Sequence, residues 1–280
     1  MTISRVGFAC NPTIEAAVEL GEVASNWCRL RGIGHWTAAA GETDRLVEEL
    51  ATTDVLVVLG GDGTFLRAAQ AVALVDVPIL GLNVGKVGFL SKAEAHELEP
   101  VLEHLVSGGY TVRERMALSG AVLPGGEPTG ARFTALNDIV VARGSLARVV
   151  RLDVTIDESH LATFVADGLV VASPTGSTGY SFSAGGPILE PQSQNLVVTP
   201  IAGYLSAIRS IVVAPNQVVR ARVLDAHEAL VSIDGREDHR IDVGDVVEVR
   251  AFERPIRFVE PDGAMPFWDL LRTKVQLLPS

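Results

Sequence analysis

The chain has 280 residues, 48% of them hydrophobic and 5% aromatic, and its formal net charge at neutral pH is −11. This length is enough for two domains with hydrophobic cores of their own. The negative charge argues against wholesale electrostatic binding to DNA, RNA or an anionic membrane. The charge of an anionic substrate therefore has to be neutralised locally, by backbone amides, a few basic side chains or a metal ion.

The cysteines and the apolar runs bear on where the protein resides. The sequence has two cysteines, Cys10 and Cys28, and no CxxC pair. This is too few for a disulfide scaffold and favours a reducing compartment. Charged or turn residues interrupt every apolar run before it reaches the length of a membrane span, and the N-terminus lacks the pattern of a signal peptide. We therefore expect a cytoplasmic protein that binds neither nucleic acid nor membrane.

The first 110 residues or so alternate between strand-like and helix-like patterns. Apolar runs predict strands and apolar residues at helical spacing predict helices. The expected strands are residues 3–9, 54–59 and 77–83, and the expected helices are residues 13–31, 42–51, 64–75 and 94–106. Strands separated by helices indicate βαβ units and a mostly parallel sheet.

The helical period disappears after about residue 110. Short alternating segments separated by Gly- and Pro-containing turns occupy residues 117–144, 151–173 and 218–252, which is typical of an all-β layered domain. Residues 265–278 return to helical or mixed character. The sequence thus predicts an α/β N-terminal domain with a mostly parallel sheet, followed by an all-β layered C-terminal domain.

A strand, a glycine turn and a helix are predicted in "DVLVVLGGDGTFLRAAQAV", residues 54–72. Many folds hold a phosphate in such a turn, but this one lacks the lysine of the P-loop and is not the Rossmann GxGxxG. Gly60 and Gly61 allow a tight turn, and Gly63 allows close approach of a ligand. We expect Thr64 to cap the helix, and Arg67, one turn further on, to reach back to the same place.

Asp62 lies inside this turn, where a phosphate oxygen would repel it. A carboxylate fits there if it accepts a proton from an attacking hydroxyl, or if it holds a cation that neutralises the phosphate. Both roles belong to phosphoryl transfer to an alcohol. The structural alternative is a tight strand–helix turn with an exposed aspartate, and the local sequence favours neither interpretation over the other.

A second unusual stretch is "DGLVVASPTGSTGYSFSAGGPILEP", residues 167–191. It combines short hydroxyl side chains and glycines with one tyrosine, which suits an aromatic, polyhydroxylated ligand. The structural alternative is a surface loop, since Ser, Thr and Gly are common in loops. The dipeptide Asp167–Gly168, taken by itself, favours a type I′ hairpin.

Taken together, these stretches resemble the NAD kinase family, the ATP- or polyphosphate-dependent enzymes that make NADP. GGDGT alone is a weak signal, because phosphofructokinases and lipid kinases carry similar turns, whereas the run SPTGSTxYSxSAGGP is far more specific. The matching pieces follow the family's order and span most of the chain: "GGDGTFLRAA", "GLNVGKVGFL", "LNDIVVARG", "DGLVVASPTGSTGYSFSAGGPILEP", "PIAGYLSAIRSIVV" and "FVEPDGAMPFWDLLRTKVQL".

The resemblance implies a role for each part of the first turn. Asp62 would be the general base on the 2′-hydroxyl of the adenosine ribose of NAD. ATP or polyphosphate would be the phosphoryl donor, with a divalent metal ion, Mg²⁺, near its phosphates. The residues implied on the phosphate side are Gly60, Gly61, Gly63, Thr64 and Arg67.

The resemblance also implies an NAD site in the second half. Asn137 and Asp138 match the family's Asn-Glu pair, which contacts the dinucleotide, and Asp167 would meet the nicotinamide riboside end. Arg148 falls where the family often has a basic residue near the ligand. Tyr180 would pack on the adenine, within a run that surrounds the adenosine: Thr178, Gly179, Tyr180, Ser181, Phe182 and Ser183.

The implied organisation is a phosphate-donor domain of residues 1–112, to which residues 258–280 return, and a dinucleotide-binding domain of residues 113–257. Members of the family have their cleft between the two domains and are usually homodimers or homotetramers. No histidine of the chain shows metal-ligand spacing, so the sequence predicts no protein metal ligands.

Four departures from the family's pattern lie on the dinucleotide side. Asp138 stands where the family commonly has Glu, Gly179 where it has Ala, and Arg236 where it has Gln. Residues 200–211 also differ from the sequence that is typical of the family in this segment. These departures leave open a kinase of the same fold that acts on another nucleoside or sugar hydroxyl. A non-catalytic dinucleotide sensor is the other alternative, against which the intact GGDG turn argues, because binding alone requires no base.

Overall fold

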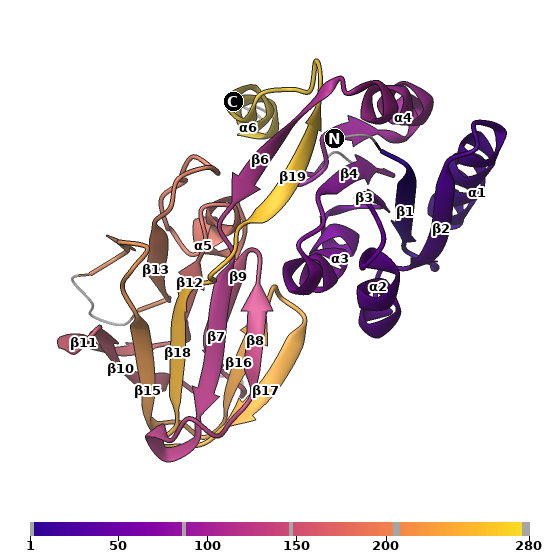
Figure 1. The fold of residues 1–280 in the computed structure, drawn as a ribbon. Helices are drawn as coiled ribbons and strands as arrows, with labels where there is room; N and C mark the ends of the chain where they lie inside the picture. The colour runs from indigo at the N-terminus through magenta and orange to yellow at the C-terminus, as the bar shows by residue number, and fades with distance from the viewer. Residues whose placement is uncertain (1–2, 86–87, 146–147, 204–207, 276–280) are drawn as a thin grey trace. The chain divides into compact units, whose positions relative to one another are not determined.

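The computed structural model describes residues 3–85, 88–145, 148–203 and 208–275 (Figure 1). The chain divides into two compact units. Unit 1 consists of residues 1–114 and 256–280, and unit 2 of residues 115–255.

Unit 1 is built on a sheet with the strand order β2-β1-β3-β4-β19-β6, and the short β5 pairs with β4. The central pairs β1–β2, β1–β3 and β3–β4 are parallel. The strands are β1 (Arg5–Cys10), β2 (Gly34–Ala39), β3 (Val55–Leu59), β4 (Ile79–Asn83), β5 (Ala93–Glu94), β6 (Tyr110–Arg115) and β19 (Ile256–Pro261). The helices are α1 (Glu15–Leu30), α2 (Thr43–Leu50), α3 (Asp62–Val75), the 3₁₀ turn η1 (Ala95–Glu97), α4 (Leu98–Ser107) and α6 (Phe267–Val275).

Helices cover both faces of this sheet, which explains why its central strands are apolar throughout. Every residue of β3, VLVVL, is buried, as expected for a parallel strand covered on both sides. Helices α1 and α4 share one core cluster with β1, β3 and β4. Helices α2 and α3 pack against each other on the other side (Figure 1).

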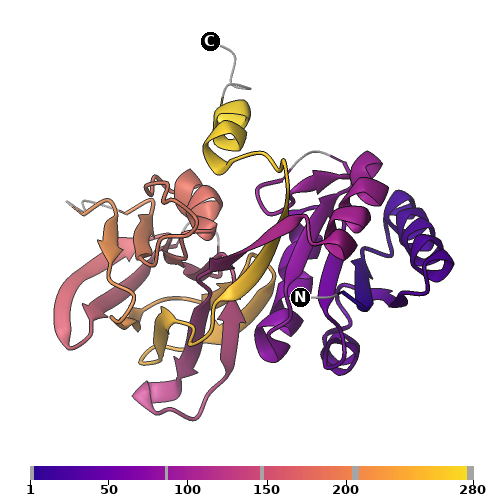
Figure 2. The ribbon, with the colours of Figure 1, turned by 45° about the horizontal axis from the view of Figure 1, so that its top comes forward.

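The chain returns to unit 1 after residue 255. Strand β19 lies between β4 and β6 and pairs with β4 in parallel, with Phe258 opposite Ile79. Figure 2 shows β19 in yellow beside β6 in magenta, with α6 following it. The expected return of the C-terminal segment to the first domain is confirmed.

Unit 2 is all-β apart from short helical turns. Among the described residues, two six-stranded sheets run β11-β10-β15-β18-β7-β8 and β14-β13-β12-β9-β16-β17. The first contains β7 (Leu118–Leu123), β8 (Arg132–Ala135), β10 (Val150–Ile156), β11 (Ser159–Ala166), β15 (Val219–Asp225) and β18 (Val246–Ala251). The second contains β9 (Asp138–Arg143), β12 (Gly168–Ala172), β13 (Leu196–Ile201), β14 (Ile211–Val213), β16 (Ala229–Ile233) and β17 (Glu237–Ile241). The turns are η2 (Pro124–Gly126), η3 (Gly176–Thr178) and α5 (Tyr180–Ser183).

The core of unit 2 lies between these sheets. One apolar cluster takes alternate residues from both, such as Leu152 and Val154 of β10 and Leu169 and Val171 of β12. Alternation of this kind is what packs two sheets face to face. The predicted fold class, an α/β domain with a mostly parallel sheet followed by an all-β domain, is confirmed.

Two local expectations were incomplete or wrong. Strand β2 was not predicted, because its sequence GHWTAA is short and alternates buried with partly exposed residues at an edge of the sheet. The predicted hairpin at Asp167–Gly168 is wrong, since β11 pairs with β10 while β12 pairs with β9 and β13. The Asp-Gly dipeptide carries the chain from one sheet to the other instead of reversing it within one.

None of the helices that the structure describes combines the length and the apolar character needed to cross a membrane.

Candidate active site

The GGDG turn leaves the carboxyl end of β3 and enters α3. Cys10 at the end of β1 is paired with Leu59 at the end of β3. From β1 the chain proceeds to β2 on one side, whereas β3 and β4 lie on the other. The strand order therefore reverses between β1 and β3. Ligands of open α/β sheets bind outside the carboxyl ends of the strands at such a switch point.

Asp62 is the first residue of α3 and joins the turn to the loop after β4. Its Oδ2 accepts a hydrogen bond of 2.9 Å from the Phe89 amide, and its Oδ1 accepts one of 3.2 Å from the Leu90 amide. A Cβ at Gly88 would lie 1.8 Å from Asp62 Oδ1, so only glycine allows the loop to approach this closely. The carboxylate is held in one orientation while its residue remains partly exposed.

The other residues predicted on the phosphate side surround this turn. Gly61 and Gly63 border open space, because a Cβ at either would meet no described atom within 4 Å. Arg67 is exposed one turn along α3. The predicted cap by Thr64 is wrong: α3 begins at Asp62, its N-cap is Gly61, and no side chain caps it. Thr64 is instead a buried residue of the first turn.

In unit 2, three of the predicted NAD-binding residues line one pocket of about 350 Å³. These are Asn137, Asp138 and Tyr180, and the rest of the lining is Val140, Ala142, Ser232, Asp234 and Gly235. Gly179 lies beside the Asn137 and Asp138 side chains. Tyr180 is 47% exposed, so its ring is available to a ligand.

Two buried carboxyl groups meet at this pocket. Asp138 is 4% exposed and Asp234 is 7% exposed. Burial, and then the nearby charge of Asp234, raise the pKa of Asp138 to about 7. Burial also raises the pKa of Asp234, but its carboxylate accepts three backbone N–H bonds, which favour its ionised form. The backbone bonds therefore favour an ionised Asp234 beside a more readily protonated Asp138.

The hydroxyl-rich stretch before and within α5 is not a simple surface loop. Its buried hydroxyls bond to the protein itself: Ser177 Oγ donates to the Pro174 carbonyl at 2.6 Å and accepts from the Leu189 amide at 2.9 Å. Ser181 is fully buried and lies 3.4 Å from the Thr199 hydroxyl. Thr178 Oγ1 donates to the Thr175 carbonyl. The side chains presented outward are those of Tyr180, Phe182 and Ser183.

Asp167 and Arg148 do not line this pocket. Asp167 forms an ion pair with Arg143, with 2.7 Å between Nε and Oδ1 and 3.3 Å between Nη2 and Oδ2. It precedes Gly168, which pairs with Ala142, four residues along β9 from Asp138. At about 3.3 Å per residue, roughly 13 Å of strand separates the two positions. Arg148 is exposed.

Two family profiles match this chain. The profile described as ATP-NAD kinase N-terminal domain matches residues 6–110, and the one described as ATP-NAD kinase C-terminal domain matches residues 136–261. An NAD kinase of Dehalococcoides mccartyi is 35% identical over 272 residues, which are 97% of this chain and 96% of that protein. An NAD kinase of Moorella thermoacetica is 43% identical over 231 residues, covering 82% and 73%. The chain belongs to the NAD kinase family.

Solved structures of NAD kinases share this fold. The structure of an NAD kinase from Archaeoglobus fulgidus in complex with ATP has a TM-score of 0.78 and 25% identity, and the match covers 98% of this chain and all of that one. Yeast NADH kinase complexed with NADH has a TM-score of 0.84 at 23% identity, covering 99% of this chain and 88% of that one. At that identity the yeast structure supports the fold alone.

Sequence analysis missed Asp234, a carboxylate in the lining of the unit 2 pocket. It stands in "IDGRE", where the Asp-Gly dipeptide marks the turn between β16 and β17. The dipeptide indicates a turn and gives no sign that its carboxylate accepts hydrogen bonds from residues about one hundred positions earlier in the chain. The family resemblance drew attention to Arg236 of this segment and not to Asp234.

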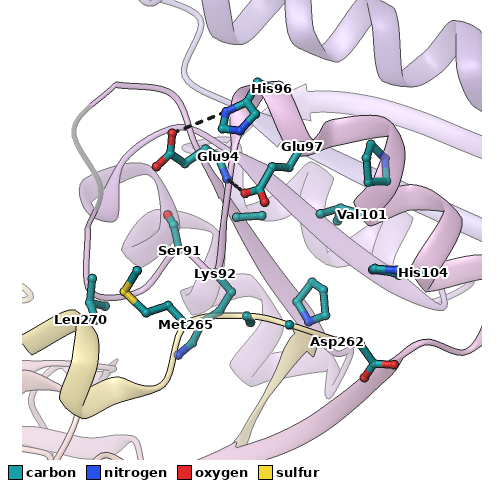
Figure 3. Close-up of a pocket in the computed structure, with 15 residues that line it drawn as sticks. Ser91, Lys92, Glu94, His96, Glu97, Val101, His104, Asp262, Met265 and Leu270 are labelled. Carbon is teal, nitrogen blue, oxygen red and sulfur yellow. Dashed lines mark hydrogen bonds and ion pairs between the residues drawn. The ribbon is translucent and has the colours of Figure 1, made fainter.

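Unit 1 contains a pocket of about 410 Å³, whose lining includes Ser91, Lys92 and Leu270 (Figure 3). None of the predicted site residues lines it. At its edge, Glu94 Oε2 lies 3.5 Å from His96 Nδ1, and Glu97 Oε2 accepts a hydrogen bond from the Glu94 backbone amide (Figure 3). Lys92 pairs with Glu260 at 3.2 Å.

Proposed function

We propose that this protein is an NAD kinase that transfers a phosphoryl group from ATP to the 2′-hydroxyl of the adenosine ribose of NAD. The observation that carries the proposal is the position of Asp62. Its carboxylate is fixed by two amides at the switch point of a parallel sheet, in a chain that matches NAD kinases along nearly its whole length. Polyphosphate is an alternative donor that the family resemblance implies.

Asp62 acts in this proposal as the general base. The ribose 2′-oxygen attacks the γ-phosphorus of ATP, its proton passes to the Asp62 carboxylate, and the bond to the β–γ bridging oxygen breaks to release ADP. The two amide bonds leave further lone pairs on the carboxylate for this proton. General-base catalysis of this kind contributes about 10²–10⁴-fold.

The phosphate side of the site is the start of α3 with its glycines. The N-terminus of a helix favours an anion through its free N–H groups and its dipole. We assign Gly60, Gly61, Gly63 and Thr64 to this side, with Arg67 as a cation that reaches the donor from the exposed face of the helix. The open space beside Gly61 and Gly63 supports their contact with phosphate oxygens.

A magnesium ion is part of the proposal. Mg²⁺ in phosphoryl-transfer sites is usually held by one or two carboxylates together with the phosphates of the substrate. We assign no protein side chain to the ion, so the oxygens of the donor phosphates and of water would be its ligands. When bound, the ion neutralises the donor phosphates and so reduces their repulsion with Asp62.

Unit 2 supplies the NAD-binding residues. Asn137, Asp138 and Tyr180 would hold the adenosine half, with Thr178 to Ser183 forming that wall of the site. Asp167 would hold the nicotinamide riboside end, and Arg148 would contribute a basic group. The spacing of roughly 13 Å between Asp138 and the start of β12 suits the two halves of one extended dinucleotide.

We further propose that residues 1–112 with 258–280 act as the phosphate-donor domain and residues 113–257 as the dinucleotide-binding domain. We also propose a cytoplasmic homodimer or homotetramer. Cys10 and Cys28 are both free and buried, which is compatible with a reducing compartment. Light scattering on the purified protein measures the oligomeric state directly.

The decisive experiment is a product assay. Purified protein is mixed with ATP, Mg²⁺ and NAD, and NADP is detected with an NADP-specific dehydrogenase. We expect NADP to form with a kcat/KM far above that for the phosphorylation of AMP or adenosine. Preference for a mononucleoside or sugar would identify a kinase of the same fold with another acceptor. Tight NAD binding with no phosphorylated product would identify a sensor.

A further inference from the structure

We propose that Asp234 is a positioning residue for the dinucleotide: its carboxylate fixes the backbone of residues 136–138 and so directs the Asn137 and Asp138 side chains into the pocket of unit 2. The inference rests on the proposed function in one respect, that NAD is the ligand of this pocket. Nothing in the family resemblance assigns this role to the residue.

The carboxylate of Asp234 accepts hydrogen bonds from the backbone amides of three consecutive residues. Its Oδ2 accepts from the Leu136 amide at 3.0 Å, and its Oδ1 accepts from the amides of Asn137 at 2.7 Å and Asp138 at 3.2 Å. The Asp234 amide returns a bond of 3.0 Å to the Asp138 carbonyl. Hydrogen bonds to a charged acceptor are the stronger kind, so this segment is held rigidly against the β16–β17 turn.

The same segment is fastened from its other side. The Ser173 amide donates to the Asn137 carbonyl at 2.8 Å, and Ser173 Oγ donates to the Leu136 carbonyl at 2.5 Å. A Cβ at Gly176 would lie 2.0 Å from the Asn137 carbonyl oxygen, so glycine is required at this contact. With both faces of the backbone fixed, the side chains of Asn137 and Asp138 have little freedom in where they point.

One atom of this arrangement lacks a partner. Asn137 Oδ1 is buried and accepts no hydrogen bond from any residue that the structure describes. A buried acceptor without a partner is costly, and here it belongs to a residue that lines the pocket. A ligand with a hydroxyl or amino donor, as a nucleoside has, would satisfy it.

The turn does not by itself require an aspartate. Asp234 has a φ of +50° and Gly235 a φ of +68°, and asparagine enters this left-handed region as readily as aspartate. Asp234→Asn therefore keeps the turn. It replaces one accepting oxygen by an amide group, which cannot accept from a backbone N–H. The variant separates the role of the carboxylate from that of the turn.

The experiment compares Asp234→Asn with Asp245→Asn as its matched control. Asp245 is also a turn carboxylate of unit 2, and it accepts bonds of 2.9 Å from the amides of Gly125 and Asp242. It does not line the pocket. We expect Asp234→Asn to weaken NAD binding, measured by calorimetry, about tenfold or more, as the loss of a charge-assisted hydrogen bond would. The KM for ATP should change less than about twofold, and Asp245→Asn should leave both constants near wild type.

A pH profile supplies a readout that general destabilisation would not move. Asp138, Asp234 and Tyr180 are the titratable groups lining the pocket, and Arg236 follows in the same turn. The charge of Asp234 adds to burial in raising the pKa of Asp138. Removing that charge should move the midpoint of the pH dependence of NAD affinity to lower pH in Asp234→Asn, and not in Asp245→Asn.

Should Asp234→Asn not fold, Asp234→Glu takes its place. It keeps the charge and moves the carboxylate by one methylene, so NAD affinity should fall while the pH midpoint stays high. Unchanged NAD affinity and pH midpoint, or equal losses for NAD, ATP and thermal stability, would overturn the positioning role. Because calorimetry reads binding directly, this outcome is distinct from a wild-type protein that forms no NADP, which would refute the proposed function alone.

Discussion

In each unit, a carboxylate at the candidate site joins two distant stretches of backbone, but these two carboxylates, Asp62 and Asp234, differ in their surroundings. In unit 1, Asp62 accepts hydrogen bonds from the amides of Phe89 and Leu90 and remains partly exposed at the start of α3. In unit 2, Asp234 accepts three amides and is buried beside a second carboxyl group, Asp138.

The difference shows how the environment assigns a role to the same functional group. A carboxylate fixed by two amides and still open on one side can accept a proton from a substrate. A buried carboxylate with three amide partners has its lone pairs largely occupied and serves to hold its neighbours. We therefore expect variants of unit 1 to reduce turnover and variants of unit 2 to reduce binding, and the following predictions test that division.

The largest effect is expected at the base. Asp62→Asn retains the shape of the side chain and removes the proton acceptor, so kcat should fall roughly 10²-fold or more, while the affinity for NAD changes far less. Steady-state kinetics and calorimetry measure the two quantities. Near-wild-type turnover would mean that Asp62 only closes the turn, and a melting curve shows whether the variant is folded.

The next effect tests the support of that base. Gly88→Ala would place a Cβ 1.8 Å from Asp62 Oδ1, so the carboxylate or the loop has to move. Because small misplacements of a reacting group are costly, we expect kcat to fall on the order of tenfold to a hundredfold. Gly41→Ala is the control, since a Cβ there meets no described atom within 4 Å. Equal activity in both variants would show that the Asp62 position tolerates displacement.

Tyr180 tests binding in unit 2. If its ring stacks on the adenine, Tyr180→Ala should weaken NAD binding by about 1–3 kcal/mol, the range for stacking of a base on an aromatic ring. Tyr180→Phe keeps the ring and should be much milder. Calorimetry with both variants decides the matter, because equal losses would assign the effect to the hydroxyl, and a loss confined to kcat would contradict the division between the units.

Asp167 tests the far end of the same ligand, with a smaller effect. Asp167→Ala removes the partner of Arg143 and, under the proposal, the contact with the nicotinamide riboside. Binding energy from a remote part of a substrate normally contributes to the rate at the reacting centre. We expect kcat/KM for NAD to fall severalfold while kcat/KM for AMP is nearly unchanged. The ratio of the two values, which measures the preference for NAD over AMP, should therefore decrease. A parallel fall for both acceptors would remove Asp167 from the nicotinamide side.

The last effect is on stability, not on turnover or binding, and it depends on pH. Burial and the charge of Asp234 raise the pKa of Asp138 from its usual 3.8 to about 7, so the folded protein retains a proton that the unfolded chain releases. Between about pH 4 and pH 7 the free energy of unfolding should therefore fall as pH rises. Urea unfolding across this range should give a shallower slope for Asp138→Asn. A slope identical to that of the wild type would show that Asp138 is ionised in the folded protein.

The sequence alone determined the fold class and the position of the first turn. The positions of apolar residues reflect which faces of a helix or strand are buried. The short apolar run of residues 54–59 is therefore enough to assign a buried strand, and the apolar spacing of residues 64–75 is enough to assign a helix. Local patterns failed where a short edge strand, β2, buries only alternate residues, and at Asp167–Gly168, where a hairpin signal was overridden by pairing in two different sheets.

Only the tertiary structure decided what the carboxylates contact. Asp62 meets residues 27 and 28 positions further along the chain, and Asp234 meets residues 96 to 98 positions earlier. No local pattern encodes such partners, because they are set by which strands become neighbours when the sheets form. The same packing buries Asp138 and brings Asp234 beside it, and burial is what changes the protonation of a group whose sequence context is an ordinary strand end.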